Sequence, residues 1–208
     1  MNFFQKILFG IFKFIYPSKI NGLEKICDGP AIIVCNHFSV VDCGFMLKLS
    51  KKKLYFLAKK EAFKNKLFSK ILSSFGAIPI NRDNPSIKSL FTAIKLLKNG
   101  NKLVIFPEGT RNKTGTDELQ PLKSGSGVFA VKARCPIIPV TILKKPRPFI
   151  RTRLLVGDKI DLSDYYNKDL TEEVVAELDG IISLEMKSLH AQLKSTVLKK
   201  KGKKNVSC

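Results

Sequence analysis

Short, almost uninterrupted apolar segments most strongly constrain what this chain can fold into. Three of them, "AIIVC" (residues 31–35), "KLVIF" (102–106) and "IIPVTI" (137–142), have the length of β-strands but little of the alternation that marks a half-buried strand. Strands that are apolar on both faces occur in sheets that helices cover on both sides. The sequence therefore predicts an α/β fold, with a mostly parallel or mixed sheet flanked by helices.

The remaining elements are predicted from turn residues and from the helical spacing of apolar positions. Asn84 and Pro85 indicate the start of one helix, and Thr171 indicates the start of a long C-terminal helix. The predicted helices cover Glu61–Ser74, Asn84 to Asn99–Gly100, Gly127–Ala133 and the segment after Thr171, and the further strands cover Leu54–Ala58, "GAIPI" (76–80) and, as an edge strand, "RTRLLVG" (151–157).

The N-terminal segment "MNFFQKILFGIFKFIY" is predicted to be an amphipathic helix. As a helix it would be about 24 Å long, which is shorter than the ~30 Å hydrocarbon core of a bilayer. A helix lying in the membrane interface therefore fits better than a spanning one. One side of its helical wheel carries Asn2, Gln5, Lys6, Gly10 and Lys13, and the other carries Phe3, Phe4, Ile7, Leu8, Ile11, Phe12, Phe14 and Ile15.

Two other interpretations of this segment stay open. A cleaved signal peptide would need a small-residue cleavage site, and "YPSKINGLE" offers a poor one. An amphipathic helix can also pack its apolar side on its own domain. We expect a membrane-associating helix at residues 1–16, a single domain at 17–198 and a basic, disordered tail at 199–208.

Charge and cysteine usage narrow the functional classes. The chain has 37 Lys and Arg residues against 17 Asp and Glu, a formal net charge of +20, which favours phosphate-bearing partners such as anionic lipid, an anionic substrate or nucleic acid. Five cysteines without a Cys-x-x-Cys pair, and only two histidines, do not form a zinc motif. We expect reduced thiols and a domain facing the cytoplasm.

His37 follows the apolar segment 31–35 almost directly, and Asp42 comes five residues later. At the carboxyl end of a buried strand, a carboxylate can bind one imidazole nitrogen and leave the other facing a substrate. Histidine suits a general base because its ordinary pKa lies near the working pH. A histidine at a strand end can also be structural, so the pair needs support from the rest of the chain.

Two other strand exits supply that support. "FPEGTR" (106–111) carries Glu108 and Arg111 around a glycine, and "GAIPINR" (76–82) ends in an arginine. If the strands are neighbours, these residues form one rim with a base and two phosphate anchors. Gly-x-Ser-x-Gly and a phosphate-binding loop are both missing, and His190 is predicted to be structural. Direct attack by a substrate hydroxyl that His37 deprotonates is then the expected chemistry.

Four segments of the chain resemble, in order, four sequence blocks of the glycerolipid acyltransferase family. They are "NHFSVVD", "GAIPINR", "FPEGTR" and "CPIIPV", and they span residues 36 to 140. "LKSGSGVFAVKA" is similar to the lysine- and glycine-containing segment that follows the third block in that family. The second block departs from the family at Pro79 and Asn81.

The resemblance implies acyl transfer from a thioester, acyl-CoA or acyl carrier protein, to the sn-2 hydroxyl of lysophosphatidate, giving phosphatidate. It implies no cofactor and no metal, and it implies a membrane lipid surface as a partner, with the enzyme on the cytoplasmic face of the cell membrane. By this analogy, His37 is the base and Asp42 its orienting partner. The acceptor-binding residues would be Arg82, Glu108, Gly109, Thr110, Arg111 and Lys123, and Pro136 and Pro139 would shape the acyl-donor side.

Three alternatives remain at this point. The same mechanism could act on glycerol-3-phosphate or on another lysolipid. A basic membrane-binding scaffold without catalysis would fit the charge, but the His37–Asp42 pair counts against it. A nucleic-acid-binding protein would need aromatic residues interleaved with a basic face, whereas the aromatic residues concentrate near the N-terminus, so we expect no nucleic acid partner.

Overall fold

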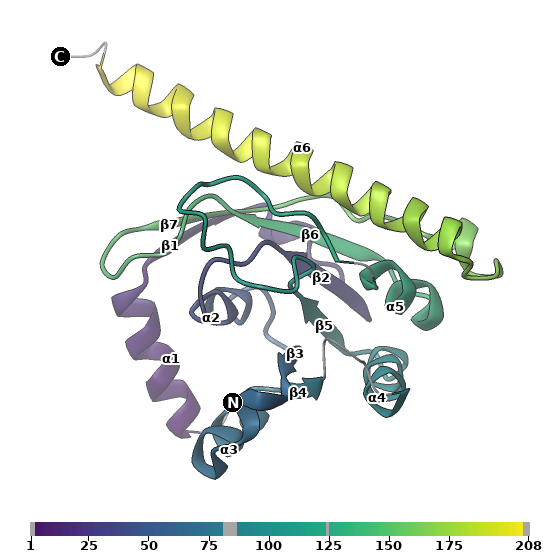
Figure 1. Cartoon of the computed structure of the whole chain (residues 1–208). Helices are drawn as coiled ribbons and strands as arrows, with labels where there is room; N and C mark the ends of the chain where they lie inside the picture. The colour runs from purple at the N-terminus through teal and green to yellow at the C-terminus, as the bar shows by residue number, and fades with distance from the viewer. Residues whose placement is uncertain (1–2, 81–86, 124, 206–208) are drawn as a thin grey trace.

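The computed structural model describes residues 3–80, 87–123 and 125–205, and it contains a seven-stranded sheet (Figure 1). The strand order is β1-β7-β6-β2-β5-β3-β4, and every neighbouring pair is parallel except β6 with β7. This confirms the predicted α/β fold with a mostly parallel, mixed sheet. The strands are β1 Ser18–Asn21, β2 Ala31–Cys35, β3 Leu54–Lys59, β4 Ala77–Ile80, β5 Lys102–Ile105, β6 Ile137–Ile142 and β7 Thr152–Val156.

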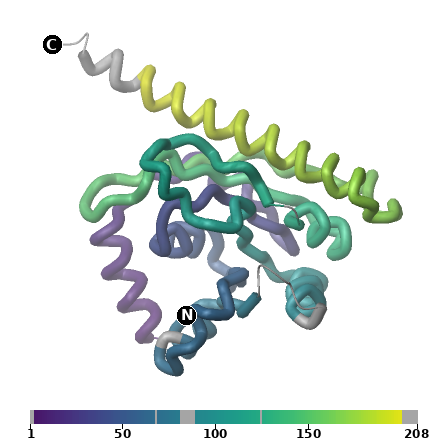
Figure 2. Tube along the Cα trace, viewed as in Figure 1, coloured from purple at the N-terminus to yellow at the C-terminus, as the bar shows by residue number. Residues whose placement is uncertain are grey.

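Helices cover both faces of this sheet. They are α1 Phe3–Ile15, α2 Asp42–Met46, α3 Lys66–Ser74, α4 Ile87–Lys98, α5 Ser126–Ala133 and α6 Glu172–Asn205. Side chains of β2 alternate between two cores: Ile32 and Val34 pack with α4, α5 and α6, while Ile33 and Cys35 pack with α1 and α2. The Cα trace in Figure 2 shows α6 along one face and α1 on the other side. The central strand is apolar throughout because both its faces are buried.

Two predicted elements differ from the structure. The segment 151–157 is not an edge strand, because β1 pairs with β7 in parallel. The sequence does not predict β1, because Ile20 is its single large apolar residue. The helix predicted over Glu61–Ser74 is a 3₁₀ turn, Lys60–Phe63, followed by α3. The side chain of Asn65 accepts a hydrogen bond from the backbone N–H of Leu67, 2.9 Å, which caps the start of α3.

The start of α6 agrees with the prediction from the sequence, whereas its end does not. Thr171 caps its start, since its hydroxyl accepts a hydrogen bond from the N–H of Val174, 3.4 Å. The helix then continues to Asn205, so residues 199–205 are helical where the sequence predicted disorder, because the lysines do not interrupt the helix. The predicted Asn84 cap lies outside the described residues.

Helix α1 packs on the domain with one side and exposes the other. Phe12 packs against Phe45, with ring centroids 5.3 Å apart, and the amide of Gln5 donates to the carbonyl of Ser74, 2.9 Å. Gly44 permits this approach, because a Cβ there would lie 2.4 Å from the ring of Phe12. The outward side carries exposed large apolar residues, which are Phe3, Phe4, Ile7, Ile11 and Phe14. None of the described helices has both the length and the hydropathy that crossing a membrane requires.

Candidate active site

The carboxyl ends of the parallel strands meet at one edge of the sheet, and the predicted site residues follow them. Val34 of β2 is in register with Ile105 of β5, so the loops that leave these two strands are adjacent. His37 follows β2 and is 8% exposed, and Asp42 begins α2 and is fully buried. The sheet therefore brings the residues of the first and third sequence blocks together.

A hydrogen bond joins the predicted base to its carboxylate. His37 Nδ1 lies 2.9 Å from Asp42 Oδ2, which also accepts the backbone N–H groups of Phe38 and Ser39 at 2.7 Å each. The loop between the two residues thus wraps around one carboxylate oxygen, which explains the five-residue spacing. Because that oxygen accepts, Nδ1 of a neutral His37 carries the proton and Nε2 is left as the basic nitrogen.

The segment after β5 holds the backbone of His37 on both sides. Glu108 Oε2 accepts the N–H of His37 at 3.4 Å, and the N–H of Asn112 donates to the carbonyl of His37 at 2.6 Å. The ring of His37 also stacks on Phe106, with centroids 4.0 Å apart and planes 20° from parallel. The imidazole is therefore fixed by its neighbours, as a preorganised base requires.

Glu108 is turned into the protein. Only 3% of the residue is exposed, and burial raises the pKa of its carboxyl to about 7, although hydrogen bonds from the backbone of His37 and Gln120 oppose the shift. Its carboxylate anchors the backbone of His37 by accepting the N–H of that residue. Its predicted role as an acceptor ligand stays a prediction.

This pKa shift has a measurable consequence for stability. The Glu108 carboxyl has a pKa of about 7 in the fold against 4.5 without the shift, so the folded state binds its proton more tightly than the unfolded state does. The free energy of unfolding should therefore fall as pH rises from about 4.5 to about 7, relative to Glu108→Gln, which does not titrate. Urea unfolding of both proteins across this range measures the difference.

A glutamate on the surface provides the control. Glu118 is exposed and pairs with Lys194 at 3.2 Å. Glu118→Gln should follow the pH dependence of the wild type, because the buried carboxyl is still present. A wild-type protein that tracks Glu108→Gln at every pH would contradict the raised pKa.

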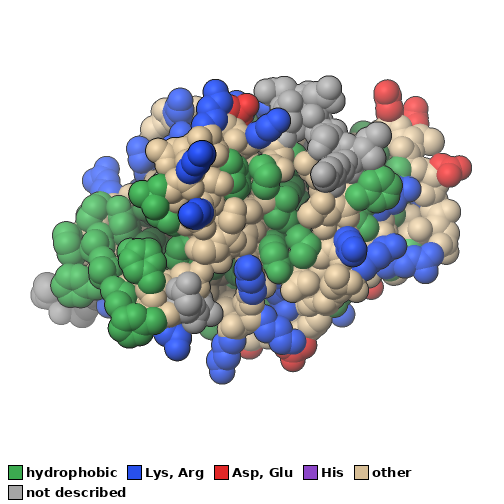
Figure 3. Space-filling model, turned by 90° about the horizontal axis from the view of Figure 1, so that it is seen from below, with side chains coloured by type: hydrophobic (Ala, Val, Ile, Leu, Met, Phe, Trp, Pro, Cys, Tyr) green, Lys and Arg blue, Asp and Glu red, His purple; other side chains and the backbone are tan. Residues whose placement is uncertain are grey.

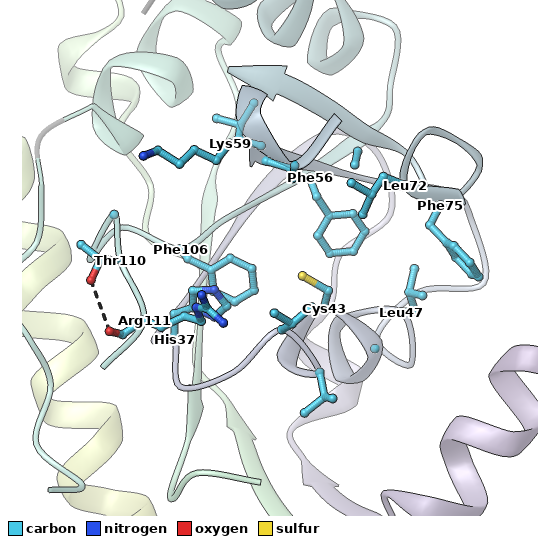
Figure 4. A pocket seen from close by; sticks show the side chains of 18 of the residues that line it. His37, Cys43, Leu47, Phe56, Lys59, Leu72, Phe75, Phe106, Thr110 and Arg111 are labelled. Carbon is cyan, nitrogen blue, oxygen red and sulfur yellow. Dashed lines mark hydrogen bonds between the residues drawn. The ribbon is translucent and has the colours of Figure 1, made fainter. Parts of the chain in front are cut away.

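The turn after Glu108 brings a lysine to the site. Gly109 has φ +69°, and a Cβ at this position would lie 2.6 Å from Cδ of Lys123, so glycine lets the lysine chain lie against the turn. The N–H of Lys123 donates to the carbonyl of Pro107, 2.7 Å. The hydroxyl of Thr110 donates to the carbonyl of Arg111, 3.2 Å (Figure 4).

His37 lies at the junction of two parts of one cavity, whose volume is about 680 Å³. Lys59, Thr110 and Arg111 lie at one end, and Leu72 and Phe75 lie at the other (Figure 4). The polar part is completed by Gly109, Lys113 and Lys123, and the apolar part by Leu8, Phe9 and Phe12 of α1, Val40, Val41, Cys43, Gly44 and Leu47 around α2, Phe56, Leu57 and Ala58 of β3, and Ala62, Ala77 and Phe106.

The structure therefore brings together His37, Asp42, Glu108, Gly109, Thr110, Arg111 and Lys123. Arg82, the other predicted acceptor ligand, lies outside the described residues. Pro139 lies within β6 and Pro136 directly precedes it, and neither lines the cavity. Across the part of the chain that the structure describes, no group of three or more His, Cys, Asp and Glu residues could hold a metal ion.

Sequence reasoning missed three polar residues that shape the site. Asn112 holds the carbonyl of His37 and is itself bound to the carbonyl of Glu118, 2.8 Å. The amide of Asn36 bridges to β6, since it donates to the carbonyl of Ile142 at 2.9 Å and accepts its N–H at 2.7 Å. Lys59 ends β3 beside the cavity. Asn36 is the first residue of the first sequence block and Asn112 directly follows the third, and these positions are the signals that could have identified them.

Comparison with known proteins shows which family the chain resembles. The family model described as Acyltransferase matches residues 17–143. A 1-acyl-sn-glycerol-3-phosphate acyltransferase of Bacillus subtilis is 30% identical over 174 residues, which are 78% of this chain and 83% of that protein. One of Streptococcus pneumoniae is 31% identical, over 80% of this chain and 63% of its own length.

A solved structure has the same fold. The crystal structure of the 1-acyl-sn-glycerophosphate (LPA) acyltransferase PlsC from Thermotoga maritima superimposes with a TM-score of 0.68 and 27% sequence identity. The match covers 92% of this chain and 77% of that one. The likeness therefore extends over most of the chain.

Proposed function

Because the chain belongs to the acyltransferase family and is an O-acyltransferase, we propose that it transfers a fatty acyl group from a thioester to the sn-2 hydroxyl of lysophosphatidate, giving phosphatidate. The observation that carries the proposal is the position of His37 between a cationic and an apolar part of one cavity. Lysophosphatidate has the matching division, with a phosphate next to its free hydroxyl. The relatives that act on this class of substrate by name support the same choice.

The chemistry follows from the tautomer of His37. Nε2 takes the proton of the acceptor hydroxyl while the hydroxyl oxygen attacks the thioester carbonyl, which forms the new C–O bond and a tetrahedral oxyanion. The oxyanion collapses, the C–S bond breaks, and the leaving thiolate takes the proton from the imidazolium. Asp42 keeps Nδ1 hydrogen-bonded throughout and stabilises the imidazolium.

The acceptor phosphate would lie against the cationic end of the cavity. Arg111, Lys113 and Lys123 line it there with Lys59, and Arg111 can hold two phosphate oxygens at once. Gly109 and Thr110 contribute a turn whose backbone approaches the ligand closely. Arg82 follows β4, whose carboxyl end is at the same edge of the sheet, and we propose it as a further ligand.

Arg111→Ala should raise the KM for lysophosphatidate about tenfold or more, because the charge-assisted hydrogen bonds of the arginine to phosphate are lost. The kcat should change much less, since the arginine binds a phosphate that does not react. Initial rates over a range of acceptor concentrations measure both constants. Arg153→Ala, which removes the same charge from β7, should leave both near the wild-type values. An unchanged KM in Arg111→Ala would remove this residue from the phosphate site.

The apolar part of the cavity would hold an acyl chain. It lies between α1, α2 and α3, so its wall includes the helix whose opposite side is exposed. We propose that the exposed side of α1 rests in the membrane interface, on the cytoplasmic face of the cell membrane. Large exposed phenylalanine and isoleucine side chains on an amphipathic helix support this placement.

A transfer assay against both donor types tests the function. The protein is incubated with acyl-CoA or acyl carrier protein and with lysophosphatidate, glycerol-3-phosphate or another lysophospholipid, and products are identified by mass. We expect phosphatidate from lysophosphatidate with stoichiometric release of thiol. Acylation of glycerol-3-phosphate alone would replace the proposed acceptor, and thiol release without any acylated lipid would contradict the function.

A further inference from the structure

The connection between β6 and β7 exposes large apolar side chains that no part of the proposed reaction uses. Phe149 is 69% exposed and its neighbour Ile150 is 57% exposed. Neither lines the cavity, and both stand outside the two cores of the domain. Adjacent exposed apolar residues that continue an apolar surface mark an interaction site more often than isolated ones do.

This loop is joined to the exposed side of α1. The ring of Phe149 contacts that of Phe14 edge-on, with centroids 6.1 Å apart, and the N–H of Phe149 donates to the carbonyl of Ile15, 2.6 Å. In Figure 1 the loop lies beside the C-terminal end of α1. Figure 3 shows hydrophobic side chains gathered at this end of the molecule. Helix and loop therefore form one apolar surface, made of Phe3, Phe4, Ile7, Ile11, Phe14, Phe149 and Ile150.

The backbone holds Phe149 in its exposed position. Its φ is +61°, in the left-handed region that is strained for a bulky residue. The buried Pro146, and Pro148 directly before Phe149, each fix one backbone angle, so the loop is restricted on its N-terminal side. A strained conformation persists where the surroundings over-determine it, and such sites cluster at functional positions. Here the strain serves to present an aromatic ring to the outside.

The charges around the loop favour an anionic lipid surface. Lys145, Arg147 and Arg151 are exposed, and none of them forms an ion pair with a residue that the structure describes. Lys144, in contrast, is paired with Asp117 at 3.0 Å. Aromatic residues next to unpaired cations match the membrane interface, where rings insert and cations bind lipid phosphates. A second copy of this chain would instead bring two basic surfaces together, at a net charge of +20 each.

We propose that the β6–β7 loop is a second membrane-insertion element, which binds anionic lipid together with α1. The proposal rests on the proposed function, in which α1 lies in the membrane interface. A single helix attached to a membrane can roll about its axis, whereas a helix and a loop fix an orientation. Since Leu8, Phe9 and Phe12 on the inner side of α1 line the cavity, two attachments would also fix the cavity relative to the bilayer.

Vesicle binding in the absence of substrate tests the loop directly. Cosedimentation is measured with vesicles of phosphatidylcholine, with and without phosphatidylglycerol. The double variant F149S/I150S should lower the partition coefficient at least about tenfold, because it removes two inserting side chains. R147Q/R151Q should weaken binding about fivefold for each arginine, and only when phosphatidylglycerol is present. F91S/L184S removes two equally exposed apolar side chains from α4 and α6, and it should bind like the wild type.

One further variant and two further measurements separate the possible outcomes. The variant I7S/I11S alters only the exposed side of α1, and it should also weaken binding. If it does so while F149S/I150S binds like the wild type, α1 acts alone and the proposal is wrong. A lipid-free dimer that F149S/I150S dissociates would assign the surface to a second copy and would also overturn it. Activity on detergent-dispersed lysophosphatidate should be unchanged in F149S/I150S, and failure of the wild type in that assay would overturn the proposed function instead.

Discussion

His37→Ala is expected to lower kcat for acyl transfer by about 10²- to 10⁴-fold, which is the usual contribution of a general base. His37 is the histidine that lines the cavity, and its Nε2 is the nitrogen left free by the hydrogen bond to Asp42. Among the residues described around the cavity, the other ionisable side chains are those of lysine, arginine and cysteine. Alanine therefore removes the group that takes the proton and leaves the cationic and apolar parts of the cavity in place.

Thiol release from acyl-CoA in the presence of lysophosphatidate measures this loss, and circular dichroism checks that the variant is folded. His190→Ala is the matched control, because it makes the same change in a buried histidine that contacts Thr141, 2.7 Å, rather than the cavity. It should lose stability through that hydrogen bond and keep most of its kcat. Near-normal turnover in His37→Ala would contradict the proposed mechanism.

The order of the elements could be predicted because the spacing of the hydrophobic residues indicates where each strand and helix lies. The segments 31–35, 102–106 and 137–142 are apolar on both faces, and they lie side by side at the centre of the sheet. β1 could not be found in this way, because a four-residue strand with one large apolar side chain resembles a loop in sequence. For the same reason, the sequence predicts its partner β7 as the edge of the sheet. Short strands at the margin are specified by their pairing rather than by their own composition.

The N-terminal helix shows a different limit. The helical wheel separates its two sides, but it does not say which side meets the domain. In the structure Gln5, from the polar side, is buried, Phe12 is partly buried, and large apolar residues from the same side of the wheel as Phe12 face outward. Gly44 determines which side of α1 packs on the domain, because only a glycine at this position of α2 leaves room for the ring of Phe12. The contact joins Phe12 and Gly44, which are 32 positions apart, and the local sequence around either residue does not predict it.

The site could be predicted in its residue types but not in its orientations. The spacing between His37 and Asp42 gave their pairing, since four intervening residues are enough for one loop to wrap a carboxylate. The family resemblance predicts Glu108 among the acceptor-binding residues, and it does not predict that the Glu108 carboxylate accepts the backbone N–H of His37. The contact of Asn112 with His37 could not be predicted from its residue type, because Asn112 makes that contact through its backbone N–H. Which way a side chain turns depends on the neighbouring strand.

Asp42→Asn is expected to lower kcat by about 10³- to 10⁴-fold while the KM for lysophosphatidate stays within about threefold. Asparagine has nearly the same size, so the fully buried site is not left with a cavity. If its oxygen keeps the three hydrogen bonds, the negative charge that stabilises the imidazolium is lost. If its NH₂ group faces His37 instead, Nδ1 must accept, and Nε2 then carries the proton and cannot act as a base.

The same carboxylate also supports the loop, so stability and catalysis have to be separated. Its bonds from the N–H groups of Phe38 and Ser39 are charge-assisted, and weakening them should cost about 2 kcal/mol, or about 4–8 °C in Tm. Kinetics are therefore measured well below the Tm of the variant. Asp158→Asn, at an exposed carboxylate paired with Lys25, should alter neither property appreciably. A folded Asp42→Asn with nearly normal kcat would make Asp42 a loop cap only, and the orientation of His37 would then be held by its stacking on Phe106 and its backbone contacts to Glu108 and Asn112.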